Sequence, residues 1–307
     1  MSPALVRVVV VTYNPGDELA AFLSSLPEAT TATYEVLLAD NGSTDGAPQA
    51  AAADDPSVTL LETGGNLGYG KAANLGASGA GTDWVVVANP DVRWRPGALD
   101  ALLEAGERWP QAGCLGPAIV TGRSTGRSTG QDALYPSARA FPTLGRGTGH
   151  ALAGWWWPSN PWTRSYRAEA GAPVEGSVGW LSGSCMLLRR EAFAAVGGFD
   201  PIYFMFCEDM DLCRRLAEAG WTNVYVPDAV VEHSGGHSYK HDPRPMLKAH
   251  HRSLYIYLAR QYPRPWQAPV RGLLAVGLSA RYLLAARVPA AGEGAAPTRT
   301  ADLLEDS

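Results

Sequence analysis

Three largely apolar runs in the first hundred residues are each followed by polar residues, and this arrangement constrains the fold more than any other feature. The runs are 5–11, 34–39 and 84–88, and they are followed by Thr12-Tyr13-Asn14, Asp40-Asn41 and Asn89-Pro90-Asp91. Short apolar runs without alternation are typical of strands buried on both faces. Helix-compatible segments lie between them, at 17–26, 47–53 and 69–77. We therefore expect an α/β fold with a mostly parallel central sheet flanked by helices, and with the polar loops gathered at one edge.

A pair of carboxylates, Glu208 and Asp209, directly follows the apolar run 204–207. A carboxylate held against apolar groups loses hydration, which raises its pKa and suits it to act as a general base near neutral pH. Acidic residues also favour the first turn of a helix, where they interact well with its dipole, so the pair alone leaves both interpretations open. A further acid at the end of a buried strand, Asp91, favours the catalytic interpretation, although Asn-Pro-Asp is also typical of a turn.

Taken in order, several short motifs resemble those of a known family. They are Val11-Thr12-Tyr13-Asn14, the Asp40–Asp45 loop, Asn66–Gly70 with Asn74, Asn89-Pro90-Asp91, Gly198-Phe199-Asp200 and Glu208-Asp209. The series resembles that of the family 2 glycosyltransferases, which have the GT-A fold. Within that family the chain is most similar to bacterial rhamnosyltransferases, in particular the actinobacterial ones that act on N-acetylglucosaminyl-diphospho-decaprenol. The resemblance implies inverting transfer of L-rhamnose from dTDP-L-rhamnose to a polyprenyl-diphosphate-linked N-acetylglucosamine, in synthesis of the arabinogalactan linker of the cell wall.

The resemblance also implies a set of donor-binding residues at the strand ends and in the loop before residue 69. Thr12 and Tyr13 would receive the nucleobase, and Asp40 would accept a hydrogen bond from it. The remaining residues expected to bind the donor are Asn14, Asn41, Gly68, Lys71, Asn74, Asn89 and Asp91.

Asp91 is the expected ligand of Mg²⁺ or Mn²⁺, because these ions prefer oxygen donors and keep phosphate oxygens of the substrate in their shell. The ion would stabilise the charge that develops on the leaving diphosphate. Asn89 stands where an Asp-x-Asp motif has its first carboxylate. A second ligand is therefore needed, and the resemblance points to His233; the alternative is that His233 and His237 are ordinary loop histidines.

By resemblance, Asp209 is the general base, and Glu208 orients the acceptor or supports the loop. General-base catalysis contributes about 10²–10⁴-fold to a rate. The resemblance places Trp180, Ser182 and Gly183 on the acceptor side. For each of these three, a role in a sheet strand packed against a helix is an equal alternative.

Two other motifs compete for the same residues. The segment Gly65–Ala72 follows a predicted strand at 58–62 and nearly matches a phosphate-binding P-loop, but Ala72 stands where Ser or Thr would bind Mg²⁺. A calcium loop starting at Asp40 fails because Gly42 occupies a ligand position. The alternatives to a rhamnosyltransferase are thus a P-loop NTPase, a silent nucleotide-sugar-binding protein, or a family 2 transferase using another sugar, such as UDP-galactose, for exopolysaccharide or O-antigen.

Composition indicates a cytoplasmic protein. The four cysteines form no Cys-x-x-Cys pair, which is typical of a reducing compartment. Residues 1–11 lack the pattern of a signal peptide, and no apolar stretch reaches the length of about 18 residues that would span a bilayer. The net charge of −5 does not fit a nucleic-acid-binding chain, and homo-oligomer formation stays open.

The charge is concentrated near the C-terminus. Residues 243–292 contain no Asp or Glu but eight Lys or Arg: Arg244, Lys248, Arg252, Arg260, Arg264, Arg271, Arg281 and Arg287. Together with leucines at helical spacing and Trp266, this predicts a basic amphipathic helical segment at 241–288. We expect it to lie on an anionic membrane surface, making the protein peripheral on the inner face of the plasma membrane. The alternative is a helix packed on the catalytic domain with a solvated basic face.

We therefore predict a catalytic domain at 1–240, the basic segment at 241–288 and a disordered tail at 289–307. The catalytic domain would comprise a nucleotide-binding half at about 1–120, a flexible insertion at about 121–175 and an acceptor half at about 176–240. The insertion holds a tandem Gly-Arg-Ser-Thr repeat at 122–129 and the tryptophans Trp155–Trp157 and Trp162. These aromatic residues either contact acceptor or lipid, or anchor the insertion.

Overall fold

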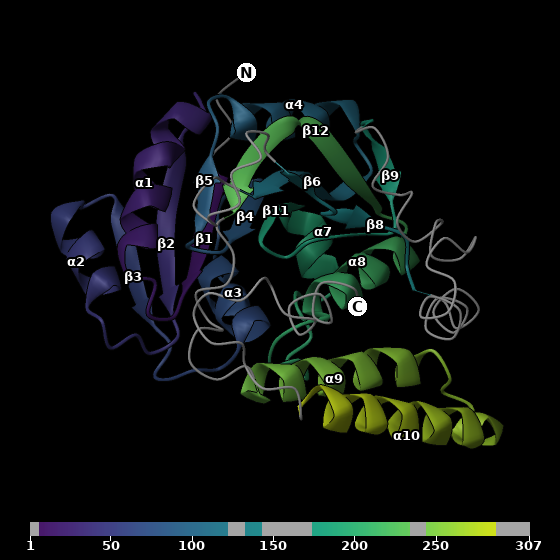
Figure 1. Cartoon of the computed structure of the whole chain (residues 1–307). Helices are drawn as coiled ribbons and strands as arrows, with labels where there is room; N and C mark the ends of the chain where they lie inside the picture. The colour runs from purple at the N-terminus through teal and green to yellow at the C-terminus, as the bar shows by residue number, and fades with distance from the viewer. Residues whose placement is uncertain (1–5, 122–132, 143–173, 234–243, 287–307) are drawn as a thin grey trace. The chain divides into compact units, whose positions relative to one another are not determined.

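The computed structural model describes residues 6–121, 133–142, 174–233 and 244–286 (Figure 1). The chain divides into two compact units, the first formed by Met1–Asp200 with Asp209–Gly235 and the second by Pro201–Glu208 with Gly236–Ser307. The repeat at 122–129, the tryptophans at 155–162, His237 and the predicted tail at 289–307 lie outside the described residues.

One large sheet forms the centre of the first unit, with its main path in the order β3-β2-β1-β4-β11-β6-β12-β5. The strands are β1 Val6–Thr12, β2 Tyr34–Asp40, β3 Val58–Glu62, β4 Trp84–Ala88, β5 Val92–Trp94, β6 Ala112–Thr121, β11 Cys185–Arg189 and β12 Thr222–His233. Strands β3, β2, β1 and β4 are parallel, and so are β6 and β12, whereas β11 and β5 pair antiparallel with their neighbours. The predicted α/β class with a mostly parallel central sheet is confirmed.

The described part of the first unit also contains four short strands. β7 Ala133–Tyr135 pairs with β6, and β9 Gly176–Val178 pairs with β12. β8 Ala138–Arg139 and β10 Trp180–Leu181 form a separate two-stranded sheet. The flexible insertion predicted at 121–175 therefore has to be narrowed, since residues 133–142 contribute strands to both sheets.

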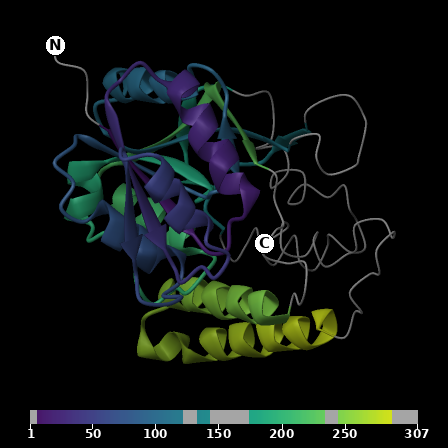
Figure 2. The same cartoon turned by 90° about the vertical axis from the view of Figure 1, so that its left-hand side faces the viewer.

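Helices cover both faces of the large sheet (Figures 1 and 2). Helices α1 Asp17–Ala29, α2 Ala47–Asp54 and α4 Ala98–Arg108 pack on one face, and α3 Tyr69–Ala77, α7 Arg190–Ala195 and α8 Glu208–Glu218 pack on the other. Successive side chains of a strand point to opposite faces. In β1, accordingly, Val8 and Val10 contribute to the core with α1 and α4, whereas Val9 and Val11 contribute to the core with α3 and α8. The continuous apolar runs of the sequence follow from this burial on both sides.

The register of the parallel strands aligns their carboxyl ends. Thr12, the last residue of β1, lies opposite Asp40, the last residue of β2, and Val10 lies opposite Ala88 at the end of β4. The polar loops after these three strands therefore leave the sheet at the same edge, as the sequence predicts.

The second unit contains a helical hairpin, built from α9 Arg244–Arg260, the short 3₁₀ helix η3 Pro265–Gln267 and α10 Ala268–Ala285 (Figures 1 and 2). The segment predicted at 241–288 is thus two helices that pack against each other. Among the described residues, no helix has the length and apolar character needed to cross a membrane.

Candidate active site

Asp40 organises the loop that follows β2. The Thr12 hydroxyl donates a 2.9 Å hydrogen bond to Asp40 Oδ1, and the Ser43 amide donates one of 3.1 Å to Oδ2. The Ser43 hydroxyl also donates to Oδ1. Asp40 is buried, with 2% of its surface exposed, so these neighbours take up much of its hydrogen-bonding capacity. Its predicted contact with a nucleobase stays a prediction.

The loops after β1 and β2 are joined by Asn14. Its side-chain oxygen accepts a 2.7 Å hydrogen bond from the Thr44 backbone amide, and the Asn14 backbone amide donates to Ser43 Oγ at 2.9 Å. Asn14 adopts a φ of 48°, in the left-handed region that asparagine tolerates better than most residues. Tyr13, by contrast, is 52% exposed. The joined loops therefore present an aromatic ring that a planar base could stack on.

Asn41 connects these loops to the glycine-rich segment before α3. Its amide nitrogen donates to the Gly68 carbonyl at 3.3 Å, and its side-chain oxygen accepts a hydrogen bond from the Leu67 amide at 3.2 Å. Gly68 has a φ of 89°, which favours glycine at the start of the helix. Lys71 is exposed in the first turn of α3, where its ammonium group is accessible to an anion.

Asn74 has a structural partner. Its amide nitrogen donates a 2.7 Å hydrogen bond to the Phe199 carbonyl, and its side-chain oxygen accepts one of 2.9 Å from the Phe199 amide. Gly198, with a φ of 70°, passes so close that a Cβ there would lie 2.5 Å from the Asn74 oxygen. Both ends of the Asn74 amide are thus engaged, which favours a role in holding α3 to this turn over the predicted contact with the donor.

Asp91 and His233, the two predicted metal ligands, lie side by side. Strand β5 pairs with the end of β12 so that His233 lies opposite Val92, next to Asp91. The His233 Nε2 and Asp91 Oδ1 atoms are 3.1 Å apart. Asn89, the first residue of the motif, donates its backbone amide to the Ser184 carbonyl at 2.9 Å, which fixes the start of the turn.

The donor set at Asp91 and His233 fits a divalent cation that also binds substrate oxygens. Adjacent ligands of an octahedral ion, each about 2.1 Å from it, lie about 3 Å apart, close to the observed separation. Two protein ligands leave most of the shell for phosphate oxygens and water, as is usual for Mg²⁺. Within the described part of the chain, no group of three or more His, Cys, Asp or Glu could hold an ion alone.

Asp209 lies in the first turn of α8 and is held by backbone amides. Gly183 donates to Asp209 Oδ2 at 2.8 Å, and Met210 donates to Oδ1 at 2.7 Å. Burial raises the pKa of Asp209, and this effect outweighs these hydrogen bonds and the charge of Arg139, all of which lower the pKa. The carboxylate is oriented and has a raised proton affinity, which are the properties of a general base.

Of the three residues predicted on the acceptor side, Gly183 contacts Asp209 directly, and all three have hydrogen-bond partners within the fold. The Gly183 carbonyl accepts a 2.6 Å hydrogen bond from the Tyr69 hydroxyl, and the Ser182 amide donates to the Ser137 carbonyl at 2.8 Å. The Trp180 indole donates to the Ala140 carbonyl at 3.2 Å. Trp180 and Ser182 are partly buried, so both also have a part in the fold.

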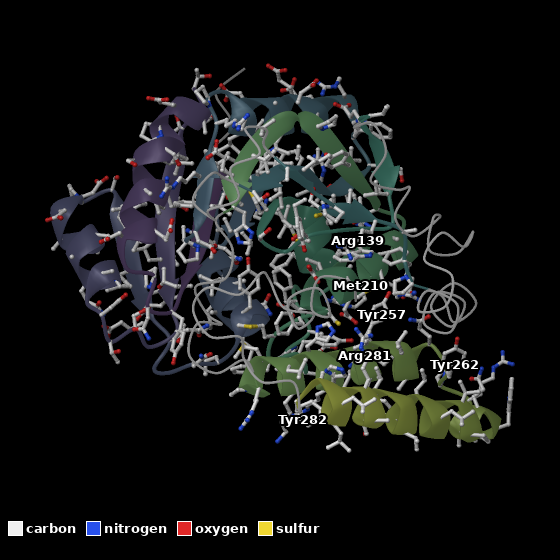
Figure 3. The ribbon with its side chains drawn as sticks, viewed as in Figure 1. Arg139, Met210, Tyr257, Tyr262, Arg281 and Tyr282 are labelled. Atoms are coloured by element: carbon white, nitrogen blue, oxygen red, sulfur yellow. The ribbon has the colours of Figure 1, made fainter. Side chains whose placement is uncertain are left out.

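Sequence reasoning missed Tyr69 and Arg139 in this region. Arg139 is buried, and its guanidinium carbon lies 5.6 Å from the centre of the Trp180 ring (Figure 3). It comes from the segment predicted to be a flexible insertion, so nothing in the sequence marked it. Tyr69 lies inside the glycine-rich motif, and an aromatic residue at the start of that helix could have marked it as a candidate site residue.

Glu208 ends a strained loop in the second unit, Pro201–Glu208. The φ angles of Phe206 and Cys207 are 68° and 62°, an unusual pair for residues other than glycine. Helix α9 holds this loop, since the Ser253 hydroxyl donates to the Met205 carbonyl at 2.8 Å. The Phe206 ring packs edge-to-face on His250, with centroids 5.2 Å apart. Glu208 itself is buried, so its predicted contact with an acceptor stays a prediction.

The sequence matches known profiles and a relative along most of its length. The profile "Glycosyl transferase family 2" matches residues 7–197, and "Glycosyl transferase family group 2" matches residues 164–289. The chain is 53% identical over 291 residues to an N-acetylglucosaminyl-diphospho-decaprenol L-rhamnosyltransferase of Mycobacterium tuberculosis (strain CDC 1551 / Oshkosh). That alignment covers 91% of this chain and 92% of the relative.

Two solved structures share the fold at low sequence identity. A mannosyltransferase, PcManGT from Pyrobaculum calidifontis, in complex with GDP-Man and Mn²⁺, is 20% identical with a TM-score of 0.59, covering 99% of this chain and 79% of that one. The crystal structure of GalNAc-T7 with UDP, GalNAc and Mn²⁺ is 16% identical with a TM-score of 0.55, covering 75% of this chain and 44% of that one. Both neighbours were solved with Mn²⁺.

Proposed function

The chain belongs to glycosyl transferase family 2, and from this premise we propose that it transfers L-rhamnose from dTDP-L-rhamnose to N-acetylglucosaminyl-diphospho-decaprenol. Its 53% identity to a relative with that acceptor in its name, over nearly the whole of both chains, supports the acceptor and the sugar. The choice of dTDP as the nucleotide rests on the sequence resemblance. The product would be the rhamnosylated lipid intermediate of a cell-wall linker.

The observation that carries the chemistry is the environment of Asp209. In the proposed reaction its carboxylate removes the proton from an acceptor hydroxyl, and the hydroxyl oxygen forms a bond to the anomeric carbon of rhamnose. The bond from that carbon to the diphosphate breaks on the opposite side, so the configuration inverts and the nucleotide diphosphate leaves with the bonding electrons. The amides of Gly183 and Met210 keep the carboxylate oriented for the proton transfer.

The residues proposed to bind the donor lie at the edge where β1, β2 and β4 end. Tyr13 offers an exposed ring for the base, and Lys71 an exposed cation for the diphosphate. Asp91 and His233 would hold a divalent metal ion, which when bound supplies positive charge to the leaving diphosphate. We infer Mn²⁺ or Mg²⁺ from the Asp91–His233 separation and the carboxylate donor.

We further propose that the protein acts at the inner face of the plasma membrane, attached peripherally to its anionic surface. An acceptor carried on decaprenol is confined to the bilayer, and the described residues 244–286 carry seven Lys or Arg without an acid. Residues 244–286 would thus keep the enzyme at the membrane, where its lipid-linked acceptor is confined.

The test is a transfer assay with purified protein, radiolabelled sugar nucleotides and a synthetic N-acetylglucosaminyl-diphosphate on a short prenyl chain. We expect label transfer from dTDP-L-rhamnose but not from UDP-galactose or GDP-mannose, stopped by EDTA and restored by Mn²⁺. Transfer from UDP-galactose alone would keep the transferase and refute the rhamnose assignment. Binding of nucleotide sugar without transfer would favour a silent binding protein, and ATP hydrolysis without acceptor would favour the P-loop alternative.

A further inference from the structure

The free side of α10 carries large apolar side chains. Leu273, Val276, Leu283 and Leu284 are between 54% and 74% exposed. Their spacing of three, seven and one residues places them on one side of a helix with 3.6 residues per turn. Exposed glycine and alanine residues, Gly272 and Ala280, lie on the same side. This side of α10, which we call the apolar face, is therefore a continuous strip and not a set of scattered residues.

The cations of α10 are directed away from the apolar face. Arg271 donates from Nη1 to the backbone carbonyls of Tyr262 and Arg264, at 2.6 and 3.0 Å. Arg281, labelled in Figure 3, is half-buried, and its charge acts on His250 and His251 of α9. These two arginines are the only charged residues in Ala268–Ala285. The apolar face of α10 thus presents only uncharged groups.

Charge around the apolar face decides between two occupants. A second copy of the chain would bring two segments with seven cations each against one another, which costs free energy. An anionic bilayer attracts the same cations, and its hydrocarbon accepts the apolar strip. Arg244, Lys248 and Arg252, spaced four residues apart, are exposed along α9 and can meet lipid phosphates.

Trp266 gives a second indication of a membrane. It is 70% exposed in η3, immediately before α10, and it follows the exposed cation Arg264. Tryptophan favours the boundary between headgroups and acyl chains, where its ring is buried and its indole N–H stays hydrogen-bonded. An exposed tryptophan and an arginine at one end of an apolar strip form the pattern of a helix lying in that boundary.

We propose that α10 inserts its apolar face into the outer hydrocarbon of an anionic leaflet, lying parallel to the membrane, with the α9 cations against the headgroups. This rests on the proposed function, since the lipid-linked acceptor gives the protein its reason to be there. In this arrangement the protein is attached to the membrane mainly by insertion of the apolar side chains of α10, and electrostatic attraction has a secondary role.

The test is co-sedimentation of the full chain with vesicles of pure phosphatidylglycerol and of pure phosphatidylcholine. We expect Leu273→Glu/Leu284→Glu to reduce binding to phosphatidylglycerol at least tenfold. The matched control is Leu134→Glu, which places the same charge at an exposed leucine of β7 in the first unit and should bind like wild type. Raising the salt to 1 M should leave at least half of the wild-type protein bound, because insertion is not screened.

Circular dichroism checks that the double variant is folded. Trp266→Ser is an independent variant, and we expect it to weaken vesicle binding several-fold.

Three results would overturn the inference: unchanged vesicle binding of both variants, complete release of wild type by salt, or a wild-type dimer in solution that Leu273→Glu/Leu284→Glu converts to a monomer without loss of vesicle binding. Transfer to the short-chain acceptor separates this inference from the proposed function. Normal turnover by a protein that does not bind vesicles would refute the membrane insertion but not the proposed reaction. Vesicle binding without any turnover would refute the proposed reaction and leave the insertion supported.

Discussion

The backbone amide of Gly183 donates a 2.8 Å hydrogen bond to Asp209 Oδ2, while its carbonyl accepts one of 2.6 Å from Tyr69. A single residue thus connects the proposed base to the first turn of α3, which begins at the glycine-rich loop. A Cβ on Gly183 would lie 3.1 Å from the Asp209 Cβ, so a glycine there keeps the approach close. The position of the base is therefore linked to the helix that carries Lys71.

Replacing Asp209 by Asn should reduce kcat by about 10²–10⁴-fold, because the amide cannot accept the proton. Donor affinity should stay within a few-fold of wild type, since Asp209 is assigned to the acceptor. Steady-state kinetics and calorimetric titration with dTDP-L-rhamnose measure the two quantities. Glu218→Gln, at the exposed end of the same helix, is the control and should leave both unchanged. A variant with full turnover would remove Asp209 from the reaction.

The pH dependence of kcat should show an acid limb set by Asp209. Burial raises the pKa of this carboxyl, and only its ionised form accepts a proton, so activity should fall as pH decreases through a value above about 3.9, the usual pKa of Asp. The same shift makes the folded state bind more protons than the unfolded state, so ionisation of Asp209 costs stability as pH rises. A pH–rate profile without this limb would contradict the assignment.

Tyr69→Phe should lower kcat several-fold while leaving the fold intact. The substitution removes one hydrogen bond to Gly183, whose net contribution is about 1 kcal/mol, equivalent to about fivefold in a rate. The KM for the donor should change less than kcat, because the lost contact acts on the Asp209 side. The matched control is Tyr34→Phe, at the start of β2 and at the other end of that strand from Asp40. Equal changes in the two variants would show that the Tyr69 effect is not specific.

Asp91→Ala and His233→Ala should each abolish the part of donor binding that depends on Mn²⁺. The two side chains lie 3.1 Å apart, so losing either leaves one protein ligand. Calorimetry with dTDP-L-rhamnose, with and without Mn²⁺, measures this part directly. Asp228→Ala removes an exposed carboxylate from β12, the strand that also carries His233, and should bind the donor as wild type does. Metal-dependent binding that survives in His233→Ala would return His233 to the role of an ordinary loop histidine.

His250 should make the protein sensitive to mild acid. Burial, followed by the charges of His251 and Arg281, lowers the pKa of His250 to about 3, and neither ring nitrogen has a hydrogen-bond partner in the part of the chain that the structure describes. The unfolded state therefore binds the extra proton below about pH 6.5, so stability falls as pH decreases. At pH 5 this costs about 2 kcal/mol relative to neutral pH.

His250→Leu should remove that loss of stability, which urea unfolding at pH 5 and pH 7.5 measures. Lys248→Leu, an exposed cation on the same helix, is the control and should retain the wild-type difference between the two pH values. An equal difference in His250→Leu and wild type would assign the acid sensitivity to another group.

The nucleotide side of the fold was predictable because its strands are local and buried on both faces. The runs 58–62 and 84–88 match β3 and β4. Strands β1 and β2 each end one residue after the predicted runs 5–11 and 34–39, and residue 5 lies outside the described residues. Helix α1 extends past the predicted end at residue 26, because Pro27 falls in its last turn and interrupts little of the helix. The insertion of antiparallel β11 between β4 and β6 was not predictable, since it pairs segments far apart in the sequence, such as Cys185 with Ala88 and Leu187 with Leu115.

The candidate site was predictable at strand ends and less so elsewhere. Thr12 and Asp40 end β1 and β2, and Asp91 follows β4, so their positions follow from parallel strands ending together. That His233 lies near Asp91 was predicted only from the family resemblance, because this proximity depends on the pairing of β5 with β12. Arg139 left no signal, since a strand of two residues is too short to show a periodicity.

The double hydrogen bond between Asn74 and Phe199 has a consequence for engineering. It joins α3, which follows the loops proposed to bind the donor, to the turn before Pro201, and Gly198 must lack a side chain for the two to meet. A chimaera that imports the second half of a relative, in order to change the acceptor, would place its junction across this bond. Such a graft should fold only when Asn74, Gly198 and a backbone of matching shape at Phe199 are transferred together, so these positions mark where recombination between relatives is permitted.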